Sequence, residues 1–304
     1  MIHRIIALLM VLLLSRITLA GERKVLFIGI DGCRPDAIAK ADTPNLDRLI
    51  KEGAYSTNTS ILGPRECGNE TVSGPGWSSI YTGVWADKHG VKDNEFEGSN
   101  YDRYPHFFSL LRQKRPDAIT AAFCDWKPIA DKIVSQATVN ECPTEELKGA
   151  EAYVAADEKL AQQAAEFLKS EDADVVCVYF GQVDETGHAK GFHPTVPEYV
   201  AAIETVDRHL GALLQAIAAR PHAADEEWLV VATTDHGGQG LRHSDGHKID
   251  EIRRVFLLAS GPGVKKANGD PQTYIVDAVP TALAWLGVEI DPKWELDGTA
   301  FGAE

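Results

Sequence analysis

Side chains that can bind a metal ion follow the ends of three apolar segments of this 304-residue chain. The segments, each a predicted buried strand, and the residues after them are 24–30 with Asp31, 173–180 with Asp184 and His188, and 229–233 with Asp235 and His236. Open α/β sheets bind ligands at the carboxyl ends of their strands, so these side chains are predicted to meet in one crevice. Carboxylate oxygens and imidazole nitrogens together suit zinc and similar divalent ions.

Two further histidines lie shortly downstream, His243 and His247, in the segment HSDGH. Together with the residues above, they offer more ligands than one tetrahedral ion needs, which favours a site for two ions. Each residue taken alone has a plainer explanation, because an Asp after a strand is often a helix N-cap. Their joint placement at successive strand ends favours the metal site.

A hydrolytic two-metal site also needs a nucleophile, and residues 71–83 supply candidates with five serine and threonine hydroxyls. Ser73 lies in a Gly- and Pro-rich loop before a predicted short helix at residues 77–82, where backbone N–H groups favour an anion. Metal coordination can deprotonate a hydroxyl that is a poor nucleophile at neutral pH. Spacing alone does not single out Ser73, and a plain helix-capping loop is the alternative.

The elements that must position these residues alternate along the chain. Strands are predicted at residues 24–30, 119–123, 173–180, 229–233 and 255–259, and longer helices at 44–52, 151–170, 197–219 and 276–286. Near-continuous apolar strands that alternate with helices indicate a mainly parallel sheet covered on both faces. We predict one α/β domain over residues 21–304.

The N-terminus has the three parts of a secretory signal peptide over residues 1–20: a basic start, an apolar run and small residues before Gly21. This predicts export to the periplasm or the extracellular space without a stable membrane anchor after cleavage; an uncleaved anchor is the alternative. The formal charge of −15 argues against nucleic acid or an anionic membrane as a main partner. Of five cysteines, Cys177 belongs to the predicted core, and one disulfide is plausible, either Cys124–Cys142 or Cys33–Cys67.

An ordered set of motifs covers almost the whole chain after residue 20. The motifs are Ile30-Asp31-Gly32, TPNLDRL at residues 43–49, SIYTG at 79–83, HGV at 89–91, DETGH at 184–188, TDHG at 234–237, SGPGV at 260–264 and LDG at 296–298. The chain resembles the alkaline phosphatase superfamily in this order of motifs, and within it the type I phosphodiesterase/nucleotide pyrophosphatase family. The resemblance implies an alkaline-phosphatase-like fold.

Site roles are also implied by the resemblance. The implied roles are one metal held by Asp31, Asp235 and His236, a second held by Asp184, His188 and a later His, Ser73 as nucleophile and metal-bound hydroxyl, and Asn94 as a phosphate-holding residue. For the last histidine we prefer His247 to His243, because it follows a Gly as in the family. Ser73 departs from the family's usual Thr, and Trp77 replaces a common His and is predicted to act behind the ligands.

The function implied is metal-dependent hydrolysis of a small-molecule phosphodiester or pyrophosphate by Ser73 through a phospho-enzyme intermediate. Two divalent ions, with zinc the expected metal, suffice, and no organic cofactor is required. Phosphomonoester hydrolysis is the first alternative, and Lys127 would then bind the extra phosphate charge. A sulfatase lacks support because the segment Ser73-Gly74-Pro75-Gly76-Trp77 has no Arg. An exported binding protein and a Ser-His-Asp hydrolase complete the alternatives.

Overall fold

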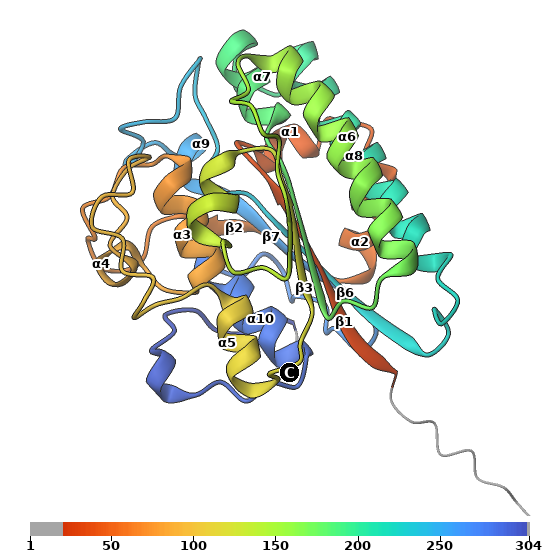
Figure 1. The fold of residues 1–304 in the computed structure, drawn as a ribbon. Helices are drawn as coiled ribbons and strands as arrows, with labels where there is room; N and C mark the ends of the chain where they lie inside the picture. The colour runs from red at the N-terminus through yellow and green to blue at the C-terminus, as the bar shows by residue number, and fades with distance from the viewer. Residues whose placement is uncertain (1–20, 303–304) are drawn as a thin grey trace, which may run out of the picture.

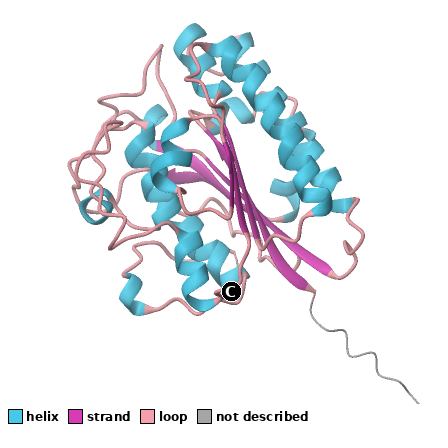
Figure 2. Ribbon diagram, viewed as in Figure 1, coloured by secondary structure: helices cyan, strands magenta, loops and turns pink. Residues whose placement is uncertain are grey.

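The computed structural model describes residues 21–302, which contain an eight-stranded sheet in the order β4-β3-β5-β1-β6-β7-β2-β8 (Figures 1 and 2). The strands are β1 Glu22–Ile30, β2 Ala54–Ser60, β3 Thr120–Cys124, β4 Val139–Glu141, β5 Val175–Phe180, β6 Glu226–Thr233, β7 Arg254–Ser260 and β8 Thr273–Tyr274. Among these strands β7 runs antiparallel to both of its neighbours, and the other pairings are parallel. The prediction of a mainly parallel sheet is therefore confirmed.

Helices cover both faces of the sheet (Figure 1). The α-helices are α1 Pro35–Ile38, α2 Pro44–Glu52, α3 Ser73–Thr82, α4 Ala86–His89, α5 Phe107–Lys114, α6 Ala150–Ser170, α7 Gln182–Lys190, α8 Pro197–Ala218, α9 Asp250–Arg253 and α10 Ala278–Trp285. Short 3-10 turns occupy Ile275–Asp277 (η2) and Pro292–Trp294 (η3), and a π-helical turn occupies Ile129–Ile133 (η1). Helices α6, α7 and α8 pack together on one face, whereas α3, α5 and α10 lie on the other, so one apolar core forms on each side.

The central strands are apolar throughout because both of their faces are covered. All six residues of β5 and the last seven of β1 are buried. In contrast, β2 has the sequence AYSTNTS, in which the polar residues Ser56 and Thr59 are buried and the other polar residues are partly buried. The apolar pattern of the sequence therefore does not predict this strand. Its antiparallel pairing with β7 therefore emerges only in the folded sheet.

Helix α3 begins at Ser73, four residues earlier than the sequence predicts. Pro75 is compatible with this start because the first helical turn has no need of its backbone N–H. Gly76 is required by close packing, since a Cβ there would lie 2.7 Å from the Cβ of Asp235. Ser73 is therefore the first residue of α3, and Gly76 lets the helix pack against Asp235, just after the end of β6.

Two other predictions concern the signal peptide and the cysteines. The predicted signal peptide at residues 1–20 lies outside the described residues. No helix within residues 21–302 is long and apolar enough to cross a membrane. Neither of the two plausible disulfides forms, because all five cysteines are free thiols, and Cys177 is buried in the core as predicted.

Candidate active site

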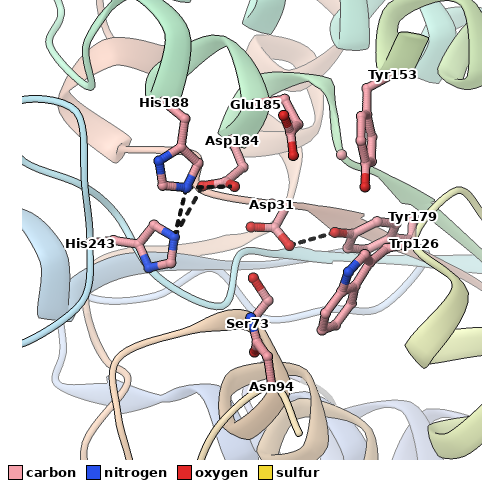
Figure 3. A pocket seen from close by; sticks show the side chains of 11 residues that line it. Asp31, Ser73, Asn94, Trp126, Tyr153, Tyr179, Asp184, Glu185, His188 and His243 are labelled. Carbon is pink, nitrogen blue, oxygen red and sulfur yellow. Dashed lines mark hydrogen bonds and ion pairs between the residues drawn. The ribbon is translucent and has the colours of Figure 1, made fainter. Parts of the chain in front are cut away.

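A cavity of about 150 Å³ opens where β1 and β5 end and α3 begins (Figure 3). The residues that line it are Asp31, Ser73, Asn94, Trp126, Tyr153, Tyr179, Gly181, Asp184, Glu185, His188 and His243. Acids and histidines from three separate parts of the chain therefore meet at the carboxyl edge of the sheet, as the strand-end pattern predicts.

One cluster, which we call the inner cluster, consists of Asp31, Asp235 and His236. Asp31 follows β1 and the other two follow its neighbour β6, so the paired strands fix their spacing. His236 Nε2 lies 3.5 Å from Asp31 Oδ1 and 3.2 Å from Asp235 Oδ2. All three side chains are at most 2% exposed.

The second cluster, the outer cluster, consists of Asp184, His188 and His243. Asp184 and His188 lie four residues apart on α7, which places them on one face of the helix. His188 Nε2 lies 3.3 Å from Asp184 Oδ2 and 3.0 Å from His243 Nε2, and His243 Nε2 lies 3.7 Å from Asp184 Oδ1. The rings of His243 and His236 stack at 3.6 Å, which joins the two clusters.

Backbone carbonyls fix the tautomer of all three histidines. The Nδ1 atoms of His188, His236 and His243 lie 2.8–2.9 Å from the carbonyl oxygens of Leu241, Gly237 and Thr71, respectively. A carbonyl can only accept a hydrogen bond, so in each neutral ring Nδ1 carries the proton and Nε2 offers a lone pair. Each Nε2 points into the clusters, which is the arrangement of metal-ligating histidines.

The carboxylates also match the requirements of cation ligands. Asp31 Oδ1, Asp184 Oδ1 and Asp235 Oδ2 are buried and have no hydrogen-bond partner within residues 21–302. Burial raises the pKa of Asp31, and the charge of Asp184 raises it further; burial and the charges of Asp31 and Asp184 likewise raise the pKa of Asp235. Unpaired oxygens and neighbouring buried acids need positive charge, so these residues fit divalent ions.

Two buried donors orient the carboxylate of Asp31. Trp77 Nε1 donates to Asp31 Oδ2 at 2.8 Å and the Tyr179 hydroxyl donates to the same oxygen at 2.5 Å. The opposite oxygen, Oδ1, is thereby directed at His236. Trp77 thus lies directly behind a predicted ligand.

Ser73 lies between the cavity and the inner cluster. Its Oγ is 3.3 Å from His236 Nε2, and it occupies the first residue of α3, where helix N–H groups favour an anion. Thr71, the nearest alternative hydroxyl, is already engaged, since it donates to the His243 carbonyl and accepts from Gly246 N–H.

Asn94 reaches the same end of the cavity from the loop after α4. Its Oδ1 accepts a hydrogen bond from Gly74 N–H at 2.7 Å. The side-chain NH₂ group is therefore available as a donor at the cavity wall. A Cβ at Gly74 would lie 2.5 Å from the Asp93 carbonyl, so only glycine lets this loop approach α3 so closely.

The structure does not bring His247 or Lys127 to the cavity. His247 is exposed and its Nε2 lies 2.7 Å from the Asn69 carbonyl oxygen, whereas His243 lies in the outer cluster. We therefore correct the last histidine of the predicted set from His247 to His243. Lys127 pairs with Asp131 at 3.4 Å on its own turn and does not line the cavity.

Several cavity residues were not predicted as parts of the site. They are Trp126, Tyr153, Tyr179, Gly181 and Glu185, whereas His243 was the less preferred of two candidate histidines. Glu185 could have been noticed, because it follows Asp184 directly in the motif DETGH. The aromatic residues have no comparable signal, since Tyr179 lies inside the apolar run of β5.

The mainly parallel sheet, the carboxylate and histidine clusters and the family match together assign the chain to the alkaline phosphatase superfamily. The type I phosphodiesterase/nucleotide pyrophosphatase family model matches residues 25–276, and the chain therefore belongs to this family, whose members hydrolyse phosphodiester and pyrophosphate bonds. Human ectonucleotide pyrophosphatase/phosphodiesterase family member 7 is 29% identical over 235 residues, which is 71% of this chain and 48% of that protein. The chain spans about half the length of the curated relatives it matches first.

Solved structures share the fold at lower identity. An inactive variant of murine ectonucleotide pyrophosphatase/phosphodiesterase 5 in complex with AMP has a TM-score of 0.60 and 18% identity, covering 89% of this chain and 96% of that chain. A 2-O GAG sulfatase has a TM-score of 0.67 and 15% identity, covering 91% of this chain and 73% of that one. At these identities the similarity concerns the fold.

Proposed function

We propose that this protein is a two-zinc hydrolase of phosphodiesters in which Ser73 is the nucleophile. The observation that carries the proposal is that the inner and outer clusters meet beside one cavity that also contains the Ser73 hydroxyl. The family match supports the same class of reaction. In the proposed assignment, the inner cluster binds one ion and the outer cluster the other.

The chain's own residues have defined roles in this reaction. Ser73 Oγ loses its proton and attacks phosphorus, the bond to the leaving oxygen breaks, and the leaving alcohol takes up a proton. The intermediate is a seryl phosphodiester that keeps the second ester group, and water then hydrolyses its Ser–O–P bond to release a phosphomonoester and restore the Ser73 hydroxyl. Asn94 donates its NH₂ group to a non-bridging oxygen, and the first turn of α3 stabilises negative charge beside Ser73. Divalent ions, when bound, supply charge neutralisation for the phosphoryl oxygens and lower the pKa of a coordinated hydroxyl.

A Ser-His-Asp triad fits this site less well. In a triad, the serine and the carboxylate lie at opposite nitrogens of the histidine ring. Here Ser73, Asp31 and Asp235 all lie on the Nε2 side of His236, and Nδ1 donates to the Gly237 carbonyl. This arrangement supports shared metal ligation.

Charge in the cavity favours diesters over monoesters. A phosphomonoester dianion carries one more negative charge than a diester, and a neighbouring Lys or Arg could neutralise it. Among the described residues that line the cavity, none is Lys or Arg, and Lys127 pairs with Asp131 instead. Phosphomonoester hydrolysis therefore ranks behind phosphodiester hydrolysis.

The test is hydrolysis of bis-p-nitrophenyl phosphate beside p-nitrophenyl phosphate by zinc-loaded protein, with and without a chelator. We expect faster turnover of the diester, abolished by the chelator and restored by zinc. Preference for the monoester would contradict the diester assignment, and activity that resists complete metal removal would contradict the metal mechanism.

Export is part of the proposal, with cleavage after Ala20. Mass spectrometry of the protein recovered from the expressing cell's periplasm or medium would test it. We expect a chain that begins at Gly21, and recovery of the uncleaved chain in the membrane fraction would support the anchor alternative.

A further inference from the structure

The carboxylate of Glu185 faces the cavity without a partner. Glu185 follows Asp184 in the first turn of α7 and lines the cavity beside it (Figure 3). Its carboxylate makes no hydrogen bond or ion pair with any other residue in the range 21–302. It is therefore a charged group that the protein itself leaves available to a ligand.

The surroundings of Glu185 are aromatic on one side and acidic on the other. Tyr153, Trp126 and Tyr179 form the aromatic part of the cavity wall, and Figure 3 shows Glu185 between Tyr153 and Asp184. Asp31 and Asp184 line the same space, but both are assigned to metal ions in the proposed function, so Glu185 is the carboxylate that remains available to the substrate. An aromatic ring face attracts cations, so these walls and the carboxylate favour the same sign of ligand charge.

An unpaired, half-buried carboxylate is unfavourable in the free protein. Glu185 is partly buried at the cavity wall, so its carboxylate loses part of its hydration without gaining a partner from the protein. A cationic or hydrogen-bond-donating group on a ligand would relieve this cost. An additional negative charge on the ligand would increase it, since like charges repel strongly in a partly desolvated cavity.

We propose that Glu185 is a specificity-determining residue that selects phosphodiesters whose second ester group is neutral or positively charged. By the same interaction it disfavours substrates with additional negative charge, namely phosphomonoesters and nucleotide pyrophosphates. The inference rests on the proposed function, because the two clusters and Ser73 are taken to hold the phosphoryl group. It narrows the substrate class from phosphodiester or pyrophosphate to uncharged or cationic diesters.

The experiment compares three substrates that release the same p-nitrophenolate. These are p-nitrophenyl phosphorylcholine with a cationic second group, bis-p-nitrophenyl phosphate with a neutral one, and the dianionic p-nitrophenyl phosphate. In Glu185→Gln, kcat/KM for the dianion relative to the neutral diester should rise about tenfold, and the value for the cationic diester should fall about tenfold relative to the neutral one.

Two variants serve as controls. Glu185→Asp keeps the charge and should retain most of the wild-type selectivity. Glu198→Gln removes one charge from an exposed position in the first turn of α8, outside the cavity, and should leave both ratios unchanged. Unchanged ratios in Glu185→Gln would overturn the proposal, and so would loss of bound zinc in that variant, because Glu185 would then support the ligands and not the substrate.

Failure of the proposed hydrolase function can be distinguished from failure of the proposed role of Glu185. If zinc-loaded wild-type protein hydrolyses none of the three substrates, the hydrolase proposal fails. Charge selection is then measured by calorimetric binding of phosphorylcholine and inorganic phosphate to the wild type and to Glu185→Gln. A tenfold loss of preference for phosphorylcholine would support the role of Glu185, and an unchanged preference would overturn it.

Discussion

The inner and outer clusters have the same kinds of ligand but different surroundings. In the inner cluster, His236 and Asp235 are fully buried and Asp31 is 2% exposed. In the outer cluster, Asp184 is 12% exposed, His243 8% and His188 39%. The inner cluster is thus the more deeply buried of the two, with only Asp31 at the cavity wall, whereas all three residues of the outer cluster line the cavity.

The difference follows from the elements that carry the ligands. Strands β1 and β6 pair in register up to Gly29 and Thr233. The inner ligands therefore lie directly after the ends of two neighbouring buried strands. The outer ligands come from helix α7 and from the loop that contains His243. Thr71 holds this loop by hydrogen bonds of its hydroxyl and its carbonyl to His243 and of its hydroxyl to Gly246. We therefore expect the inner ion to be held more tightly and to exchange more slowly than the outer ion.

The largest effect on turnover is expected from substitution of Ser73, the proposed nucleophile. Ser73→Ala should lower turnover of bis-p-nitrophenyl phosphate by at least about a thousandfold, because it removes the attacking oxygen. Both clusters should keep their ions, measured by elemental analysis. Ser78→Ala, five residues further along α3, is the matched control. Retained turnover in Ser73→Ala would show that the nucleophile lies elsewhere.

Asp235→Asn should empty the inner cluster. The substitution keeps the shape but removes an anionic ligand, so zinc content should fall by about one ion per chain and turnover by at least about a hundredfold. Asp245→Asn is the control, since Asp245 lies in the outer loop at φ 58°, where Asn is equally tolerated. Unchanged zinc content in Asp235→Asn would refute its assignment as a ligand.

His243→Ala should weaken the outer ion by at least about tenfold, because it removes one of three protein ligands. The affinity is measured by competition with a chromophoric chelator. His247→Ala, four residues further along the chain, should leave the affinity unchanged. If His247→Ala weakened the outer ion and His243→Ala did not, His247 would be the ligand. This would contradict the contacts that place His243 in the outer cluster.

Metal removal should destabilise the protein more at pH 8 than at pH 5. Burial raises the folded-state pKa of Asp31 and Asp235, so without metal these groups favour folding at low pH and lose this contribution as pH rises above 3.8 toward the raised values. Bound ions compensate the charged forms, so the drop in Tm on chelation should grow with pH, by on the order of several degrees. Calorimetry of loaded and stripped protein measures this drop at each pH.

The inner cluster should account for most of this pH dependence, since both of its carboxylates have raised pKa values. In Asp235→Asn the growth of the chelator effect with pH should therefore be smaller than in the wild type. If the drop in Tm on chelation grows equally with pH in both proteins, the pH dependence belongs to the outer cluster. That result would contradict the proposed difference between the inner and outer clusters.

The residues predicted best from sequence are those next to the strand that positions them. Asp31, Asp184 and Asp235 each follow a buried apolar run, and parallel strands bring their carboxyl ends to one edge. No comparable rule covers residues on loops. The choice between His243 and His247 depended on which residue of the HSDGH segment reaches Thr71, a contact between positions 172 residues apart.

The sequence by itself therefore determined the mainly parallel α/β fold and the two groups of strand-end acids and histidines, because local apolar patterns encode buried strands. Only the tertiary structure decided that His243 joins the outer cluster, that Lys127 turns to Asp131 and that Glu185 faces the cavity unpaired. These outcomes depend on packing between distant segments, where a side chain's direction is set by its neighbours in space and not by its neighbours in the chain.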